Sequence, residues 1–253
     1  LDRAPAILSR IKIMSDLDIA ERRLAQDGRF RFVGDGSELD VRVSIIPTLR
    51  GEGAVLRLLR PGGIALDFAA LGMSPEVCRG LEEALEARQG IVLVTGPTGS
   101  GKTTSLYAAM HRLDARARKL ISVEDPVEYR IDGVTQIQVD PKIDMGFANA
   151  LRSILRYDPD GPLIGEMRDR GTPQTSVHSA LTGHLVLSTL HTNDAPSAIT
   201  RMMELGIPPY LIRATVLGVM AQRLARTLCP HCKAPGPADE QAWQTLTRPW
   251  KAP

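Results

Sequence analysis

The sequence is poor in the residues that mark several common classes of protein. It has only three cysteines among 253 residues, too few for a disulfide scaffold, so we expect a reducing compartment. Aromatic residues amount to 4%, which disfavours a protein that stacks on bases or sugars. No apolar run approaches the ~18 residues of a membrane-spanning helix, and no basic-then-apolar leader marks the chain for export.

A marked excess of one charge is also missing. The 31 basic and 29 acidic residues leave a formal net charge of +2, whereas dedicated nucleic-acid binders usually carry a clear basic excess. Hydrophobic residues at 43% and charged residues at 24% are ordinary globular values, which exclude a disordered tail or a collagen-like chain. The chain starts at Leu1 and ends soon after an unpaired cysteine pair, so we expect a fragment or an unusually short relative of a longer protein.

The first part of the chain predicts a small domain. A helix is expected over 4–14. Residues 29–45 alternate apolar and polar side chains around a Gly-Asp-Gly-Ser turn, which is typical of a β-hairpin, and 54–59 fits a third strand. A Pro-Gly-Gly sequence then breaks the pattern. We therefore predict a partial N-terminal α/β domain over 1–60 and a linker over 61–73.

The pattern of apolar and polar residues changes at Ser74. Ser74 and Pro75 start a helix, and Ile91–Val94 is a short apolar run, as expected for a parallel strand buried on both faces. Strands and helices then alternate, which indicates an α/β domain with a mainly parallel sheet. The other predicted strands are 120–124, 163–166 and 185–190, and the helices are 103–113, 145–157, 173–181, 195–204 and 208–227. This domain is predicted over 74–228, followed by a cysteine-pair segment over 229–253.

A complete phosphate-binding loop lies between the apolar run and the next helix. It matches G-x-x-x-x-G-K-[ST], and the expected nucleotide-binding residues are Gly96, Pro97, Thr98, Gly99, Ser100, Gly101, Lys102, Thr103 and Thr104. Glycines let backbone N–H groups curl around phosphate oxygens, and the helix N-terminus adds positive potential. Lys102 supplies a charge for the β- and γ-phosphates, and the Thr103 hydroxyl ligates Mg²⁺. Because no Asn-Lys-x-Asp sequence follows to read guanine, ATP is the expected nucleotide.

Two acidic residues stand where predicted strands end. Glu124 ends the strand at 120–124 and Glu166 ends the strand at 163–166, and the carboxyl ends of strands line the ligand crevice of an open parallel sheet. Glu124 is placed to hold a water against the γ-phosphate, and Glu166 to act on the Mg²⁺ side. Each acid alone fits a solvated strand end equally well, but the complete phosphate loop favours the functional interpretation.

Taken together, these segments resemble the secretion ATPases of bacterial type II secretion and type IV pilus assembly. The resemblance covers nearly the whole chain, and its motifs are individually long and keep one order. They are the phosphate loop 96–104, the acidic segment 121–129, the segment 151–169 with its Gly-Glu-Met-Arg-Asp sequence, the histidine segment 182–194, the upstream segments 10–14, 18–23 and 42–44, and the downstream segment 222–232.

The resemblance implies a homo-hexameric cytoplasmic ATPase that docks on the inner membrane through platform proteins and uses ATP and Mg²⁺. Its fold would be a RecA-like P-loop NTPase core with a mainly parallel sheet, preceded by part of a smaller α/β, PAS-like domain. The leading function is a motor that powers type II protein secretion through pseudopilus assembly, favoured by residues 217–224 and by the Cys-Pro-His-Cys run. A type IV pilus assembly motor, a non-hydrolysing nucleotide-binding subunit and a nucleic-acid translocase remain alternatives.

The resemblance also assigns roles to residues. The catalytic ones are Glu124, which activates water, Glu166, which supports metal and water, His191 at the place of a γ-phosphate sensor, and Arg168. Six more would lie near the nucleotide or at subunit contacts: Arg42, Arg57, Arg152, Arg156, His184 and Arg201. Arg42 and Arg57 would reach from the first domain across a cleft to the phosphates. A structural hydrogen bond explains His184 equally well, and an arginine on a helix face is usually only solvated.

The chain departs from the family's pattern just before and after Glu166. Gly161 and Pro162 stand where the family has aliphatic residues, and a proline shortens or distorts a strand. An acidic residue that the family often has is missing at Arg170-Gly171. Either change could reposition Glu166 and slow or abolish catalysis.

The cysteines do not complete a metal site. Cys229 and Cys232 form half of a zinc site, whereas a structural zinc needs four ligands. The family has a second cysteine pair downstream, so we expect zinc only in a longer form that carries it. Cys78 lies at helical spacing with Leu81 and Leu85, which predicts a place in the core.

Overall fold

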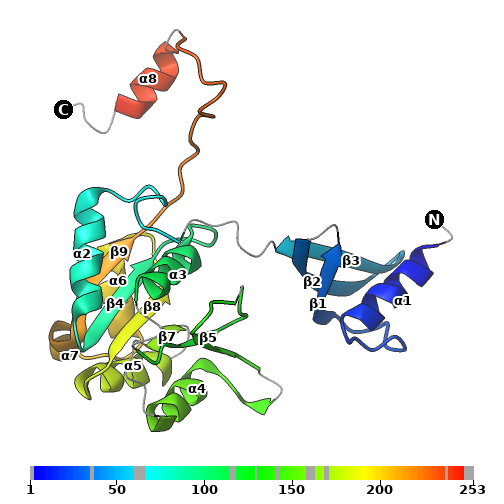
Figure 1. The fold of residues 1–253 in the computed structure, drawn as a ribbon, viewed down its shortest axis with the longest axis horizontal. Helices are drawn as coiled ribbons and strands as arrows, with labels where there is room; N and C mark the ends of the chain where they lie inside the picture. The colour runs from blue at the N-terminus through cyan, green and yellow to red at the C-terminus, as the bar shows by residue number, and fades with distance from the viewer. Residues whose placement is uncertain are drawn as a thin grey trace. The chain divides into compact units, whose positions relative to one another are not determined.

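The fold is seen in a computed structural model (Figure 1). It describes residues 3–34, 37–59, 66–113, 118–128, 130–140, 143–157, 163–167, 171–236 and 239–247. By its internal contacts the chain divides into two compact units, Leu1–Arg223 and Leu224–Pro253. The first unit holds both β-sheets and the whole candidate site.

The N-terminal part of the first unit is a helix packed on one face of a small sheet. Its elements are α1 (Ala4–Met14), β1 (Gln26–Gly34), β2 (Ser37–Thr48) and β3 (Gly51–Leu59). These strands are antiparallel in the order β1-β2-β3. Alternate residues of β2, namely Val41, Val43 and Ile45, are buried together with Ile11 of α1, which is the period-two burial expected of a sheet covered on one side. The predicted helix and strands of this part are confirmed.

The larger sheet has six strands among the described residues, in the order β6-β5-β7-β8-β4-β9. They are β4 (Gly90–Thr95), β5 (Ile121–Glu124), β6 (Thr135–Gln138), β7 (Leu163–Glu166), β8 (Leu185–Leu190) and β9 (Val216–Ala221). Each adjacent pair runs parallel, so the carboxyl ends of all six strands lie at one edge. The predicted α/β fold with a mainly parallel sheet is confirmed.

Helices cover both faces of this sheet. They are α2 (Pro75–Glu86), α3 (Lys102–Arg112), α4 (Phe147–Ile154) with the 3₁₀ helix η2 (Leu155–Tyr157), α5 (Gly171–Leu181), α6 (Ala195–Glu204) and α7 (Pro209–Thr215). Ile91 and Leu93 of β4 pack into the cluster that includes α4 to α7, whereas Val92 and Val94 pack into the cluster of α2 and α3. All six residues of β4 are buried, which explains its uninterrupted apolar sequence.

One predicted helix is wrong in its second half. The expected helix over 208–227 ends at Thr215, and Val216–Ala221 forms β9, which pairs with β4 in parallel. A short apolar run does not by itself distinguish a helix from an edge strand, and in this chain pairing with β4 decides. The strand β6, Thr135–Gln138, was not predicted, since its sequence has only one strongly apolar residue.

Part of the predicted linker packs on the core. Leu66, Leu71 and Met73 lie against the cluster of α2 and α3, and Phe68 is buried within it. The predictions that concern Gly161 and Pro162 fall outside the described residues.

The second unit has little regular structure. Residues 224–236 run without helix or strand, and α8 (Glu240–Thr247) follows. Cys229 and Cys232 are both exposed thiols. Among the helices that the structure describes, none combines the length and the apolar character needed to cross a bilayer.

Candidate functional site

Four neighbouring strands deliver the predicted site residues to one edge of the large sheet. In the order β5-β7-β8-β4, the strands end at Glu124, at Glu166, at Leu190 just before His191, and at Thr95 just before the phosphate loop. Because these strands are parallel, their carboxyl ends form the crevice in which open α/β sheets bind ligands. The structure therefore brings together residues that are up to about a hundred positions apart in the sequence.

The phosphate loop has the backbone that its glycines predict. Gly96, Gly99 and Gly101 all have positive φ angles, of 149°, 78° and 86°, which L side chains rarely adopt. At Gly96 a Cβ would also lie 2.4 Å from the carbonyl oxygen of Gln222 and 2.5 Å from Oγ of Ser100. Gly101 ends the loop in the left-handed region, and α3 starts at the next residue. The loop thus exposes backbone N–H groups at the N-terminus of α3, where an anion is favoured.

Lys102 is held inside this loop. Its side chain is buried, and its Nζ donates to the carbonyl oxygens of Gly96 at 2.8 Å and Pro97 at 3.1 Å. Burial lowers the pKa of the Lys102 ammonium, and the negative charge of Glu166 acts in the opposite direction. Glu166 is thus near enough to the loop lysine for the two charges to interact.

One hydroxyl group of the phosphate loop makes no hydrogen bond within the described structure. Oγ of Ser100 is buried and has no hydrogen-bond partner among the described residues. A buried polar atom without a partner costs free energy, and a phosphate oxygen would satisfy this one. Together with the Lys102 ammonium and the amides of the loop, the donor set fits the triphosphate of a nucleotide.

Glu124 is the most completely enclosed acid of the site. Its side chain is 9% exposed. Oε1 accepts hydrogen bonds from Oγ of Ser122 at 2.6 Å and from Nε2 of Gln136 at 3.0 Å, and Oε2 accepts a short one from the hydroxyl of Tyr107. Three elements (α3, β5 and β6) therefore fix one carboxylate.

Glu166 lies in a different environment. Its Oε1 is 2.7 Å from Nε2 of His191, and the two side chains are 15% and 48% exposed. The pair joins the end of β7 to the segment that follows β8. The structure thus brings the predicted histidine and the second acid into contact at the sheet edge.

Several residues that hold the site together were not predicted. Oγ1 of Thr95 accepts from the amide of Thr192 at 3.0 Å and lies 2.6 Å from its hydroxyl, so the start of the phosphate loop is tied to the residue after His191. The backbone amide of Gln222 donates to the carbonyl of Thr95 at 2.8 Å, and the side-chain Oε1 of Gln222 accepts from Oγ of Ser105 at 2.5 Å. Thr95 is a polar residue at the end of a buried apolar run. This is the one local feature of the sequence that indicates a residue holding the site together.

The arginines of the small sheet form a row. Arg29 pairs in register with Arg42, and Arg42 with Arg57. Arg42 donates to the carbonyl of Val127 at 3.1 Å and forms an ion pair with Glu128 at 3.1 Å. Arg29 forms a short ion pair with Asp40 and also donates to the carbonyl of Val127 at 3.3 Å.

This row extends the predicted arginine set. Arg57 is exposed on β3, and its neighbour Arg42 is mostly buried beside the segment that follows Glu124. Like charges side by side repel, and in this row the carboxylate of Asp40 offsets Arg29 and that of Glu128 offsets Arg42. Arg29 was missed because its position in a hairpin strand predicts only a solvated residue.

The remaining predicted residues lie elsewhere. His184 precedes β8 and hydrogen-bonds the carbonyl of Ser179 at 3.2 Å, so it stands at the opposite end of a strand ~20 Å long from His191. Arg152 bonds Asn149 at 2.5 Å on its own helix, Arg201 pairs with Glu204 at 3.0 Å, and Arg156 is exposed on η2. Among the described contacts, none joins these four residues to the phosphate loop, and their predicted roles stay predictions. Arg168 lies outside the described residues.

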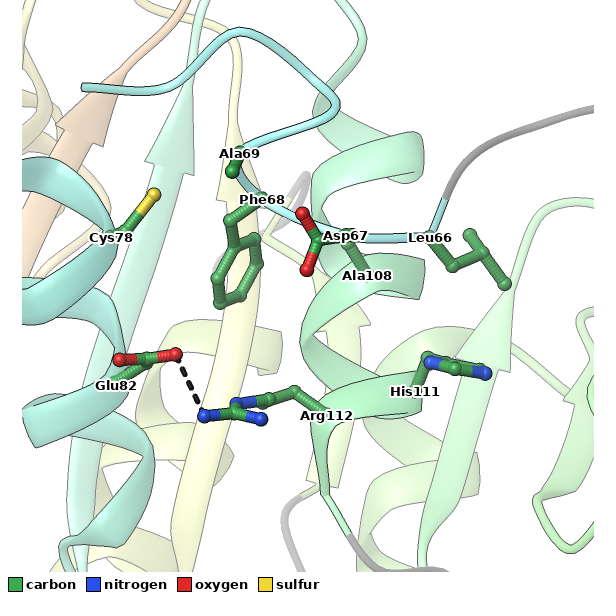
Figure 2. A pocket seen from close by; sticks show the side chains of 9 residues that line it. All are labelled: Leu66, Asp67, Phe68, Ala69, Cys78, Glu82, Ala108, His111 and Arg112. Atoms are coloured by element: carbon green, nitrogen blue, oxygen red, sulfur yellow. Dashed lines mark ion pairs between the residues drawn. The ribbon is translucent and has the colours of Figure 1, made fainter. Parts of the chain in front are cut away.

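A separate hollow of about 350 Å³ lies between α2, α3 and the segment before α2 (Figure 2). Figure 2 shows the ion pair between Glu82 of α2 and Arg112 of α3, in which Nη2 of Arg112 lies 2.9 Å from Oε1 of Glu82. The hollow is lined by Leu66, Asp67, Phe68, Ala69, Cys78, Glu82, Ala108, His111 and Arg112. The hollow uses the last turns of α3, whereas the phosphate loop joins the first, so the two are distinct. Cys78 is half-buried beside this hollow and packs against the core cluster.

Over the ranges that the structure describes, no group of three or more histidine, cysteine or acidic side chains is arranged to hold a metal ion. In proteins that use Mg²⁺ on a nucleotide, the ion is held largely by phosphate and water oxygens with one or two protein ligands. Thr103 is exposed in the first turn of α3, directly after the phosphate loop.

Comparison with known proteins gives a consistent result. The model of the family described as "Type II/IV secretion system protein" matches residues 1–252. The chain is 53% identical over 236 residues to the type II secretion system protein E of Klebsiella pneumoniae and 54% identical over 243 residues to that of Dickeya dadantii. These alignments cover 93% and 96% of this chain but 48% and 49% of the relatives. The chain thus spans about half the length of the curated relatives it matches.

Solved structures resemble it as well. The pilus retraction motor PilT with bound ADP superimposes with a TM-score of 0.67 and 33% identity, covering 79% of this chain and 59% of that one. The Legionella pneumophila ATPase DotB superimposes with a TM-score of 0.61 and 25% identity, covering 76% of this chain and 54% of that one. These similarities support the RecA-like fold expected for the core.

Proposed function

This chain belongs to the type II/IV secretion system protein family, and we propose that it binds and hydrolyses ATP with Mg²⁺ as the motor of a type II secretion system. The observation that carries the proposal is the phosphate loop itself. It presents a buried lysine and an unsatisfied buried hydroxyl at the same sheet edge as Glu124, Glu166 and His191. The donor set has the composition that a triphosphate needs.

Nucleotide binding would rearrange the bonds of Lys102. Its ammonium now donates to the carbonyls of Gly96 and Pro97, and it would turn to the β- and γ-phosphate oxygens. The hydroxyl of Ser100 would donate to a phosphate oxygen. The Thr103 hydroxyl would ligate Mg²⁺, and Glu166 would hold a water of that ion. When bound, Mg²⁺ neutralises the charge that develops on the phosphates.

Hydrolysis then needs a group that takes a proton from water. The water oxygen forms a bond to the γ-phosphorus, the bond from phosphorus to the bridging oxygen breaks, and ADP leaves with that electron pair. Glu124 would accept the proton of the attacking water, since it lies at the strand end and is fixed by three donors. His191, which meets Glu166, would sense the γ-phosphate.

The arginines supply charge from further away. Arg42 and Arg57 would bind phosphate oxygens when the first domain closes on the nucleotide, and Arg29 stands in the same row. Arg152, Arg156, Arg168 and Arg201 would act at contacts between subunits of a homo-hexamer. An arginine brought to a phosphate in trans can add large transition-state stabilisation.

Closure of the first domain over the nucleotide would turn hydrolysis into movement of subunits. The work would go to pseudopilus assembly through platform proteins of the inner membrane, from a cytoplasmic and peripheral position. The relatives named type II secretion system protein E support this system. A type IV pilus motor is the second candidate, favoured by the likeness to PilT.

A phosphate-release assay tests the proposal. Wild-type protein with ATP and Mg²⁺ should turn over, and Lys102→Ala should fall to background. Lys119→Ala is the matched control, because Lys119 sits over the ring of Tyr157 away from the loop, and it should keep the wild-type rate.

Three results would contradict the proposal. ATP binding with equal background rates in wild type and Lys102→Ala would indicate a non-hydrolysing assembly subunit. Absence of ATP binding would refute the site altogether. Stimulation of the rate by DNA would revive the nucleic-acid translocase.

A further inference from the structure

A tyrosine on α3 contacts the candidate catalytic acid. Tyr107 is 1% exposed and packs with Leu106 and Met110 in the cluster between α3 and the sheet. Its hydroxyl meets Oε2 of Glu124 in a short hydrogen bond. A phenylalanine would fill the same apolar space, so packing alone does not require the hydroxyl. A buried hydroxyl needs partners, and one of its partners is the acid.

The direction of this hydrogen bond follows from a second contact. The hydroxyl oxygen of Tyr107 accepts from the backbone amide of Glu128 at 3.1 Å. An amide N–H can only donate, so the phenol oxygen is the acceptor there, and its own proton is available for Glu124. The backbone after β5 therefore orients the phenol, and the phenol donates to the carboxylate.

The two oxygens of Glu124 have unequal surroundings. Oε1 accepts from Ser122 and Gln136, whereas Oε2 accepts from Tyr107. A carboxylate has about four acceptor sites, so within the described structure one is left over, and it is on Oε2. Oε2 is thus the oxygen that can receive the proton of a water, and Tyr107 is the donor that shares this oxygen.

We propose that Tyr107 is a positioning residue for Glu124, holding Oε2 at the angle at which it takes the proton of the attacking water. The proposal rests on the proposed function, in which Glu124 is the proton acceptor. The phenol fixes a side chain that otherwise has three rotatable bonds, so the acid is in place before ATP arrives. Ser122 and Gln136 hold the other oxygen and set the plane of the carboxylate.

The test is the Tyr107→Phe variant, which removes one oxygen atom and keeps the ring. We expect kcat for ATP hydrolysis to fall about tenfold, the value of one hydrogen bond to a charged group. KM for ATP should stay within about twofold, because the phenol is turned toward the acid rather than toward the phosphate loop. Met110→Leu, a substitution in the same cluster, is the matched control and should leave both constants unchanged.

A double-mutant cycle separates positioning from a general structural role. In the Glu124→Gln background the Tyr107→Phe change should have no further effect on the residual rate, since the proton acceptor is already gone. A packing defect would lower the rate by the same factor in both backgrounds, and that result would overturn the proposal. Circular dichroism reports whether each variant is folded. If Tyr107→Phe does not fold, Tyr107→Met, which also lacks the hydroxyl, serves instead, with the same expected loss in kcat and the same absence of effect in the Glu124→Gln background.

The same data distinguish two kinds of failure. A wild-type rate no higher than that of Lys102→Ala refutes the proposed function and this inference with it. If wild type turns over and Glu124→Gln does not, an unchanged kcat in Tyr107→Phe overturns the positioning role alone.

Discussion

The ends of β5 and β7 each present a glutamate to the same site, but they hold it in opposite ways. Glu124 is almost fully buried and accepts hydrogen bonds from a phenol, a hydroxyl and an amide. Glu166 is more exposed, meets the half-exposed imidazole of His191, and feels the charge of Lys102. One acid is fixed by three neutral donors, and the other lies beside an imidazole and within reach of the positive charge of the loop lysine.

This difference fits the different roles proposed for the two acids. Glu124 is held by three neutral donors, none of which belongs to the phosphate loop. Lys102 and His191, in contrast, are groups for which a triphosphate would compete, so the surroundings of Glu166 would change when nucleotide arrives. A proton acceptor benefits from a fixed position, whereas a ligand on the metal side benefits from one that responds to the nucleotide.

The largest effect is expected from Glu124→Gln. The amide keeps the shape and two of the acceptor contacts but takes no proton, so kcat should fall roughly 10²–10⁴-fold, the range of general base catalysis. ATP binding, measured by calorimetry, should be nearly unchanged. The control is Glu82→Gln. Glu82 lies on α2 and pairs with Arg112 at the last turn of α3, so this variant should keep the wild-type rate. A Glu124→Gln rate close to that of wild type would remove the distinction between the two acids.

The sequence was sufficient for the parts of this site that are continuous along the chain. The phosphate loop, its glycines and its lysine lie within eight residues, and a buried apolar run before them predicts β4. The parallel order of strands then predicts that Glu124, Glu166 and His191 share one edge. Each of these predictions needs only a local pattern and one rule of topology.

The parts that could not be predicted depend on contacts between distant segments. Tyr107 and Gln136 reach Glu124 from a helix and from an edge strand, and no pattern near either residue indicates that they meet. The same holds for β9, whose residues form a strand because β4 offers them an edge. For His184 the resemblance implies a place near the nucleotide, whereas its position before β8 and its hydrogen bond to the carbonyl of Ser179 fit the structural alternative, and the nucleotide role stays a prediction.

Glu166→Gln should have the next largest effect. We expect kcat to fall about 10- to 100-fold, the usual cost of losing a group that acts through a metal-bound water. Unlike Glu124→Gln, this variant should also need more Mg²⁺ for half-maximal rate. The measurement is a titration of Mg²⁺ at saturating ATP. An unchanged Mg²⁺ requirement with a lower rate would instead assign Glu166 to the attacking water, the role proposed for Glu124.

His191→Ala should have a smaller effect. The pair of His191 and Glu166 is partly exposed, and such pairs contribute about 0.2–1 kcal/mol, so we expect at most about a fivefold change in rate. If His191 also senses the γ-phosphate, KM for ATP should rise while the affinity for ADP stays constant. His178→Ala, an exposed histidine on α5, is the matched control. Equal loss of ATP and ADP affinity would contradict the sensor role.

The smallest effect concerns the segment that carries His191 into α6. Asp194 caps that helix, and its pKa is lowered by the hydrogen bond of the Ser197 side chain, then by the Ser197 amide at 2.7 Å, with the positive charge of Arg223 adding to it. A lowered pKa in the folded state means that the carboxylate stabilises the fold above the pKa of the unfolded chain. This contribution is lost as the pH falls through the folded value.

Asp194→Asn isolates that contribution, because an asparagine still caps a helix without charge. At pH 7 wild type should unfold at a temperature about 1 °C higher than the variant, and the difference should shrink as the pH falls through the lowered pKa of the folded Asp194 carboxylate and vanish once that carboxylate is protonated. Thermal unfolding followed by circular dichroism gives both values. ATPase rates of the two proteins should be equal at pH 7, since the Thr95–Thr192 contact, and not the cap, ties His191 to the phosphate loop. A slower variant would mean that the cap also positions His191, and the second acid would then be more rigidly held than its exposure indicates.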